Sequence, residues 1–190
     1  MIKEIEQIVE QACKSQANIF GYGIWTHHIT LVVKNALQLA PILGGDKDVC
    51  ELSALLHDYA SIVNSGWYPE HHIHSARLAK EILTQYKYPT QVIEKVQECI
   101  RTHRGSQSLQ PLTTEALILA NGDAMAHIQA VDSLLYLAYV QHKMGIDEGQ
   151  KWVIQKVERS WSKMVLQAQE LVREKYEATR ILFVNPGDKR

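Results

Sequence analysis

Two adjacent polar residues, His57 and Asp58, end an apolar run in the stretch LSALLHDYAS. A histidine offers a ring nitrogen and an aspartate offers two carboxylate oxygens, so the pair can bind a metal ion or move a proton. A polar side chain buried without a partner destabilises a fold by several kcal/mol. Because the preceding residues are typical of a core, we expect the pair to lie inside the protein and to have such a partner.

Further imidazole and carboxylate groups lie on apolar helical stripes elsewhere in the chain. His28 stands one turn before Val32 and two turns before Ala36, which places it on an inward face. His103 and Asp123 likewise follow apolar residues at helical spacing. The candidate ligands are His28, His57, Asp58, His103 and Asp123, together with His71 or His72, both of which can face inward.

Imidazole and carboxylate ligands without a thiolate suit divalent metals such as Mn, Fe, Zn, Co or Ni. A single inward histidine is more often a hydrogen-bonded core residue than a ligand, and we assign His127 and His142 to that role. Because five helices each carry such a group on an apolar stripe, coincidence is a poor explanation for the pattern. The sequence therefore predicts a site for one or two divalent metal ions. It does not distinguish among these metals or between them and Mg.

The elements that must position these residues are helices, because the apolar periodicity is helical nearly throughout. Glycine and proline at residues 21–23, 41, 44–45, 66 and 69 mark the breaks. No segment is rich in strand signals, and there is no internal repeat. We expect an all-α bundle forming a single domain over residues 1–190, with its core at about 20–145. The predicted helices cover residues 2–17, 25–40, 46–58, 71–86, 89–104, 113–144 and a long C-terminal helix at about 150–179.

Composition narrows the possible partners and compartments. The 190 residues carry a net charge of -1 with a pI of 6.8, so no basic surface favours a nucleic acid polymer or an anionic membrane. No segment is apolar enough to span a bilayer, and the N-terminus lacks the apolar centre of a signal peptide. The three cysteines form no metal-binding spacing. We expect a cytoplasmic protein, and the C-terminal helix could support a homodimer.

The ordered set His28, His57-Asp58 in LLHDYA, and Asp123 in NGDAMAH resembles the HD-domain superfamily of metal-dependent phosphohydrolases. The resemblance covers about residues 20–145. It implies that these four residues are metal ligands. The segments HHIHSARLAKEIL and CIRTHRGS resemble the extra histidine positions of HD branches that hold two metals. His71 stands four residues before a small residue, Ser75, as the family pattern requires, which makes it the better match and His72 the second.

The chain also departs from the characterised branches. It lacks the glycine-tyrosine-proline motif of the cyclic-dinucleotide phosphodiesterases and the acidic, arginine-bearing segment expected after Asp123 in the diadenosine tetraphosphate hydrolases. It looks most like the small stand-alone bacterial HD hydrolases, so the resemblance does not supply a substrate.

By this resemblance we predict a phosphohydrolase acting on a small phosphorylated compound, such as a nucleotide, through metal-activated water. His57 and Asp58 would be the central catalytic pair, with Asp58 bridging two metals. Arg104 could meet a phosphate oxygen, or it could be a solvated cation at a helix end. Tyr59, Trp67 and Tyr68 could wall a pocket, although a core role is the commoner use of aromatic residues.

Two other functions would use the same ligands. Some HD proteins carry a di-iron centre and cleave carbon bonds with oxygen. A regulatory module could bind a nucleotide without turning it over. Retained iron with oxygen uptake would identify the first, and nucleotide binding without turnover under any divalent metal would identify the second.

Overall fold

A computed structural model describes residues 1–104 and 111–183, and all regular elements in these two ranges are helical, which confirms the predicted all-α fold. No helix within these ranges is long and apolar enough to cross a membrane. In chain order the elements are α1 (Ile2–Lys14), the π-helical turn η1 (Trp25–Ile29), α2 (Thr30–Leu43), α3 (Lys47–Leu56), α4 (Tyr59–Val63), the 3-10 helix η2 (Ser65–Glu70), α5 (His71–Gln85), α6 (Thr90–Thr102), α7 (Thr114–Gln129), α8 (Val131–Tyr136), the π-helical turn η3 (Leu137–Gln141), α9 (Ile146–Lys163) and α10 (Leu166–Phe183).

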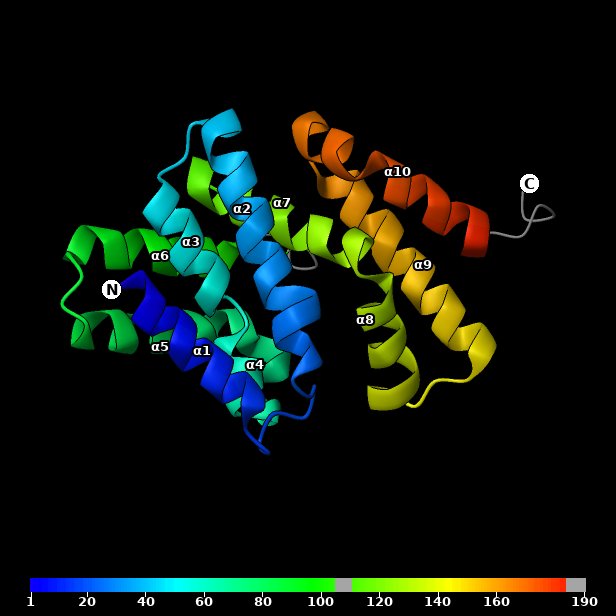
Figure 1. Ribbon diagram of the computed structural model, residues 1–190, viewed down its shortest axis with the longest axis horizontal. Helices are drawn as coiled ribbons and strands as arrows, with labels where there is room; N and C mark the ends of the chain where they lie inside the picture. Colours follow the sequence, from blue (N-terminus) through cyan, green and yellow to red (C-terminus); the bar gives the residue numbers. More distant parts are fainter. Residues whose placement is uncertain (105–110, 184–190) are drawn as a thin grey trace.

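Helix α7 is the central element of the fold. It runs through the middle of the molecule, between α2 and α3 on one side and α9 and α10 on the other (Figure 1). Nearly every residue of α7 from Ala116 to Ile128 is buried, so this helix is enclosed on all sides and also buries the polar residues Asn121, Asp123 and His127. Its most extensive contact is with α2.

The close approach of α7 to α2 depends on a glycine. A Cβ atom at Gly122 would lie 3.3 Å from the Val32 carbonyl oxygen and 3.4 Å from the Ala36 backbone nitrogen. Gly122 thus lets the two backbones nearly touch, and the Asn35 side chain donates a 3.0 Å hydrogen bond to the Gly122 carbonyl across the same contact. This packing brings Asp123, the next residue, beside η1 and His28.

Helix α3 carries the His57-Asp58 pair at its end, and its start is capped by Asp46. The Asp46 carboxylate accepts hydrogen bonds from the backbone N–H groups of Asp48 and Val49. All residues from Leu52 to Leu56 are buried, so the helix is held firmly up to the pair.

Two predicted helices are divided in the structure. The segment expected to be one helix at 113–144 ends at Ala130, whose φ of -127° and ψ of 64° are not helical, and continues as α8 and η3. The expected long C-terminal helix is broken at Met164, which is extended, and α10 folds back beside α9. The Asn121 side chain of α7 accepts a 2.8 Å hydrogen bond from the Val165 N–H, which stabilises this second break. Neither segment contains a glycine or proline at its break. The contact from Asn121 therefore accounts for the second turn, whereas at the first the Ser133 hydroxyl donates a 2.8 Å hydrogen bond to the Ala130 carbonyl.

The end of α2 also differs slightly from the prediction. The helix continues through Pro41 to Leu43 and stops at Gly44, which has a φ of 80°. The Gly44 and Gly45 N–H groups both donate to the Ala40 carbonyl. The glycine rather than the proline therefore ends the helix, because only Gly44 adopts the left-handed conformation that closes it.

Candidate metal centre

His57 and Asp58 stand at the corner between α3 and α4. His57 is completely buried, and its Nδ1 lies 2.7 Å from the Ala54 carbonyl oxygen in the preceding turn. The Ala60 N–H donates a 3.0 Å hydrogen bond to the Ser75 hydroxyl of α5, which ties this corner to the helix that carries His71. The local sequence therefore buries and orients the pair, while α5 fixes the corner in space.

Three histidines make the same backbone contact at a helix end. His57, His71 and His103 each place Nδ1 at 2.6–2.8 Å from the carbonyl oxygen three residues earlier, in Ala54, Tyr68 and Ile100. A carbonyl can only accept, so each Nδ1 carries the proton. In the neutral form, each ring then offers the Nε2 lone pair, which is the form that a metal binds.

The first group of converging atoms surrounds one oxygen of Asp58. The Nε2 atoms of His28 and His57 are 3.2 Å apart, and Asp58 Oδ2 lies 3.3 Å from the first and 3.4 Å from the second. Asp123 Oδ1 lies 3.7 Å from His28 Nε2. These four residues come from η1, from the corner after α3 and from α7.

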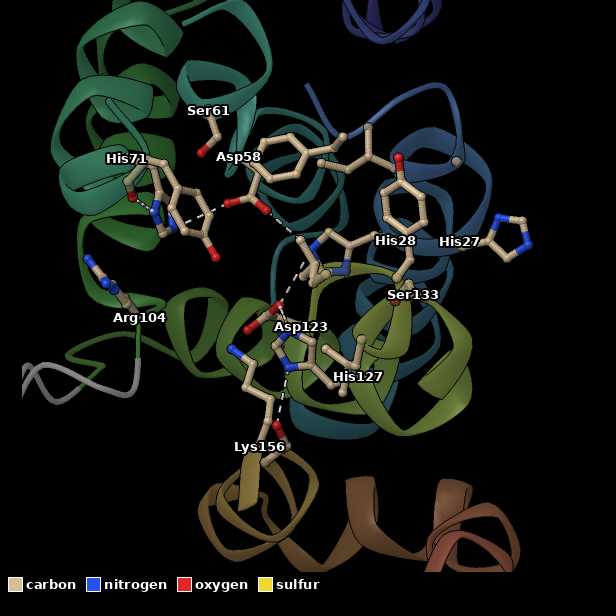
Figure 2. A pocket seen from close by; sticks show the side chains of 18 of the residues that line it. His27, His28, Asp58, Ser61, His71, Arg104, Asp123, His127, Ser133 and Lys156 are labelled. Atoms are coloured by element: carbon tan, nitrogen blue, oxygen red, sulfur yellow. Dashed lines mark hydrogen bonds and ion pairs between the residues drawn. The ribbon is translucent and has the colours of Figure 1, made fainter. Parts of the chain in front are cut away.

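The second group surrounds the other oxygen of the same carboxylate. Asp58 Oδ1 lies 3.3 Å from His71 Nε2, which in turn lies 3.3 Å from His103 Nε2. Figure 2 shows His71 on one side of Asp58 and His28 on the other, with Asp123 below them. Asp58 therefore lies between two sets of imidazoles and faces each with a different oxygen.

The electrostatics of the cluster favour added positive charge. Burial opposes a charged imidazole at His57, yet the Asp58 carboxylate outweighs this and raises the pKa of His57 to about 9. Burial, with the neighbouring His57 and His71, lowers the pKa of His103 to about 3, so His103 stays neutral. Burial also opposes ionisation of Asp58, but the surrounding imidazoles hold the pKa of that carboxyl well below its usual range.

The donor set fits divalent metal ions. Neutral His71 and His103 would point their Nε2 lone pairs at each other across 3.3 Å, which is repulsive unless a cation accepts both. The Nε2 atoms of His57 and His28 are 3.2 Å apart, a separation that a proton on His57 or a metal ion can satisfy. The ligand atoms of His28, His57 and Asp58 lie within 4.8 Å of one another, as do those of Asp58, His71 and His103, which is the spacing of a single coordination sphere. Asp123 lies within the same distance of His28 and His127. Nitrogen and carboxylate donors without sulfur suit borderline divalent cations.

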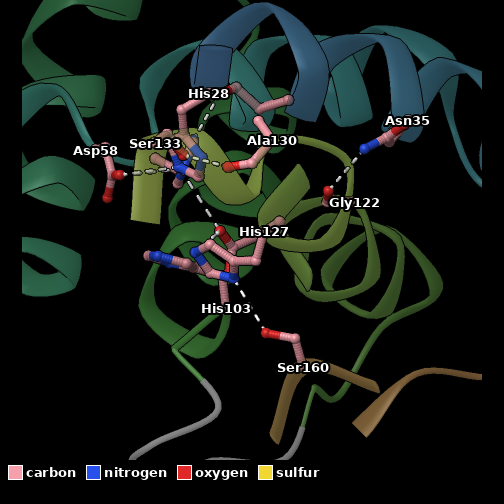
Figure 3. A network of polar contacts seen from close by, with 12 residues as sticks. His28, Asn35, Asp58, His103, Gly122, His127, Ala130, Ser133 and Ser160 are labelled. Carbon is pink, nitrogen blue, oxygen red and sulfur yellow. Dashed lines mark hydrogen bonds and ion pairs between the residues drawn. The ribbon is translucent and has the colours of Figure 1, made fainter. Parts of the chain in front are cut away.

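A third group overlaps the first and includes a histidine that we had assigned to the core. His127 is buried and stacks on His28 with ring centroids 5.6 Å apart. Its Nε2 lies 3.5 Å from Asp123 Oδ1. Its Nδ1 lies 3.2 Å from the Ser160 hydroxyl (Figure 3). Asp123 and His127 are four residues apart on α7, so they lie on the same face of the helix. This spacing is the sequence signal that could have identified His127.

The cluster opens into a pocket with a volume of about 640 Å³, which is a common size for a small-molecule site. The candidate ligands His28, Asp58, His71, His103, Asp123 and His127 line it, whereas the completely buried His57 does not. Cationic side chains of α9 and apolar side chains of η3, α8 and the segment before η1 form its walls. Sequence reasoning missed the α9 residues Lys156, Arg159 and Lys163, because nothing in the sequence shows that α9 returns to the cluster.

The remaining predicted residues fall in different places. His72 is buried, but it belongs to none of the three groups and does not line the pocket. Its Nδ1 has no hydrogen-bond partner among the described residues. Arg104 lines the pocket, and its guanidinium donates to the Pro69 carbonyl. Of the three aromatic candidates, Tyr68 lines the pocket and stacks on His71, with ring centroids 5.9 Å apart.

Comparison with known proteins agrees with this geometry. A model of the HD domain family matches residues 25–127, a range that contains every candidate ligand named above. A crystal structure of a predicted HD superfamily hydrolase from an uncultured Thermotogales bacterium is similar, with a TM-score of 0.58 and 24% sequence identity. That match covers 90% of this chain and 91% of the other and shows a shared fold. A search of curated proteins finds no match. Because the family match spans more than half of the 190 residues, the chain belongs to the HD domain family.

Proposed function

We propose that the protein is a divalent-metal-dependent phosphohydrolase acting on a small phosphorylated compound. The observation that carries the proposal is the position of Asp58, whose two oxygens face two separate sets of imidazoles at 3.3–3.4 Å. A carboxylate between two nitrogen-rich sites is suited to bridging a pair of metal ions. Membership of the HD domain family supports a metal-dependent hydrolase in general.

The residues that would hold the ions follow from the two groups. His28, His57, Asp58 and Asp123 would bind one ion, and Asp58, His71 and His103 would bind the other. Bound divalent cations supply Lewis acidity and lower the pKa of a bound water toward neutrality. The backbone carbonyls of Ala54, Tyr68 and Ile100 keep three of the imidazoles in the binding tautomer and orientation.

The rest of the pocket would bind and orient the substrate. Arg104, which lines the pocket and donates to the Pro69 carbonyl, would meet a phosphate oxygen. Tyr68 forms an adjacent aromatic wall. The pocket volume of about 640 Å³ favours a nucleotide-sized or smaller compound over a polymer.

The decisive experiment measures metal content and phosphoester hydrolysis together. Protein purified without chelator or affinity-tag metal is analysed by plasma mass spectrometry and then screened against phosphoesters with several divalent metals. We expect about two equivalents per chain and metal-dependent phosphate release, as for two-metal hydrolases. Asp58→Asn should lose both. Asp147→Asn is the matched control, because Asp147 is an exposed carboxylate outside the pocket and outside the three groups.

The other outcomes point to the alternative functions. Iron retained with oxygen uptake, and without phosphate release, would replace the proposal with oxygenase chemistry. Nucleotide binding without turnover under any metal would indicate a regulatory module. We retain a cytoplasmic location and a possible homodimer as predictions, and size-exclusion chromatography with light scattering tests the second.

A further inference from the structure

Helix α9 places a row of side chains along the pocket. Trp152, Lys156, Arg159 and Lys163 all line it, at the spacing of one helix face. The neighbouring face, with Val153 and Val157, packs in the core and holds the helix in place. At 1.5 Å per residue, the row from Lys163 to Trp152 spans about 16 Å, which is comparable to the length of a nucleotide-sized ligand.

The end of this row nearest the metal centre is cationic. Lys163 Nζ lies 3.5 Å from Asp123 Oδ2, so it stands at the edge of the candidate metal site. Lys156 extends into the pocket toward Asp123 (Figure 2). Within residues 1–104 and 111–183, Lys156 forms no ion pair with a carboxylate. Burial lowers the pKa of its ammonium group, as expected for a cation that lacks a close counter-charge.

Metal binding would increase this imbalance of charge. Asp123 is the nearest anion to both lysines, and it is also a candidate metal ligand. Once Asp123 is shared with a divalent cation, the two ammonium groups would face a floor that is itself positive. An anion from solution would then be the natural partner for them.

The other end of the row is apolar. Trp152 lies at that end of α9, and Leu134 and Leu137 of α8 and η3, two elements that contact α9, also line the pocket. Leu134 is almost completely buried, whereas the others are partly accessible from the pocket. The pocket therefore changes from cationic beside the metal centre to apolar away from it.

We propose that Lys156 and Lys163 bind the phosphoryl group of the substrate beside Asp123, and that the apolar wall around Trp152 receives its organic part. This inference rests on the proposed function and defines its substrate class as a phosphomonoester with an apolar or aromatic body. Helix α9 lies outside residues 25–127, the range that matches the family.

The lysines are tested by binding of inorganic phosphate to the metal-loaded, full-length protein, measured by isothermal titration calorimetry. We expect Lys156→Gln and Lys163→Gln each to weaken phosphate binding by about tenfold or more, since each removes a charge-assisted hydrogen bond. Lys151→Gln, an exposed position on α9 outside the pocket, is the matched control and should bind as the wild type does. Metal content is measured for every variant, so that an effect transmitted through Asp123 is recognised.

The apolar wall is tested with two phosphonates that resist hydrolysis. Phenylphosphonate should bind about tenfold more tightly than methylphosphonate, because its ring buries apolar surface on the wall. Trp152→Ala should reduce this preference while leaving inorganic phosphate binding unchanged. Equal affinity of the wild type for both phosphonates would overturn this part of the inference.

The outcomes separate this inference from the proposed function. Wild-type phosphate affinity in both lysine variants, at normal metal content, would overturn the inference even if phosphoesters are hydrolysed. Lysine-dependent phosphate binding without hydrolysis of any phosphoester would support the inference and overturn the proposed function. Absence of phosphate binding by the metal-loaded wild type would overturn the inference directly.

Discussion

At the scale of single residues, hydrogen bonds to the backbone decide which histidines can act as ligands. His71 and His72 are adjacent, both are buried, and both fit an inward stripe in the sequence. Only His71 sends its Nδ1 proton to a carbonyl, that of Tyr68, and its Nε2 toward Asp58. His72 lies outside the three ligand groups, with burial as the main cause that lowers its pKa.

This difference leads to a matched pair of substitutions. We expect His71→Asn to lose about one of two metal equivalents, because it removes a nitrogen from the group built on Asp58 Oδ1. His72→Asn should keep both equivalents. Metal content per chain by plasma mass spectrometry makes the comparison, with circular dichroism to show that both variants are folded. Loss of metal in the His72 variant alone would reverse the assignment.

At the scale of elements, the spacing between α2 and α7 sets the geometry of the centre. His28 precedes α2 on η1, and Asp123 lies on α7 directly after Gly122. The distance of 3.7 Å between His28 Nε2 and Asp123 Oδ1 therefore depends on how closely the two helices pack. The glycine that permits this packing is a structural determinant of the site, although it carries no functional group.

Gly122→Ala tests this dependence. The new Cβ would lie 3.3–3.4 Å from backbone atoms of α2, which cannot move as freely as a side chain. We expect a net loss of about 1–2 kcal/mol in the free energy of unfolding, even though alanine favours a helix. Urea denaturation measures this loss, and metal affinity should fall in parallel.

Gly23→Ala is the control, because its Cβ would meet no atom within 4 Å. It should change stability by no more than about 0.5 kcal/mol. If Gly122→Ala were as stable as the wild type with unchanged metal affinity, the spacing of the two helices would not control the centre.

At the scale of the whole molecule, the centre joins parts of the chain that are far apart in sequence. Its candidate ligands come from η1, the end of α3, α5, the end of α6 and α7, and α9 closes the pocket over them. In the absence of metal, a proton on His57 is the positive charge that balances Asp58. The stability of the folded chain should therefore respond to pH through this proton.

The pH dependence has a defined sign. The pKa of His57 rises from an ordinary 6.5 to about 9 on folding, so the folded state binds this proton more tightly. The resulting stabilisation is complete below about pH 6.5 and is lost as pH rises to about 9. We expect the melting temperature of chelator-treated protein to fall over this interval.

The metal-loaded protein is the comparison, because a bound cation replaces the proton. Its melting temperature should fall much less between pH 6.5 and 9, and differential scanning calorimetry on both forms provides the measurement. A flat profile for the chelator-treated protein would show that the His57 proton does not stabilise the fold.

Much of this molecule could be read from local patterns. Apolar periodicity predicted the all-α fold, because a helix that packs in a core must carry an apolar stripe. The same periodicity placed His28, His57, His103 and Asp123 on inward faces, where the structure brings them together with Asp58 and His71. Each of these inferences needed only residues within a few turns of one another.

The tertiary structure decided what depends on contacts between distant elements. The Asn121 bond that divides α9 from α10 joins residues 44 positions apart, so no local signal marked the break. The choice of His71 over His72 needed the Asp58 carboxylate, and the inclusion of His127 needed the stack on His28. The sequence likewise could not assign the lysines of α9 to the pocket. A helix pattern states which face is buried, but only packing against α7 determines what that face meets.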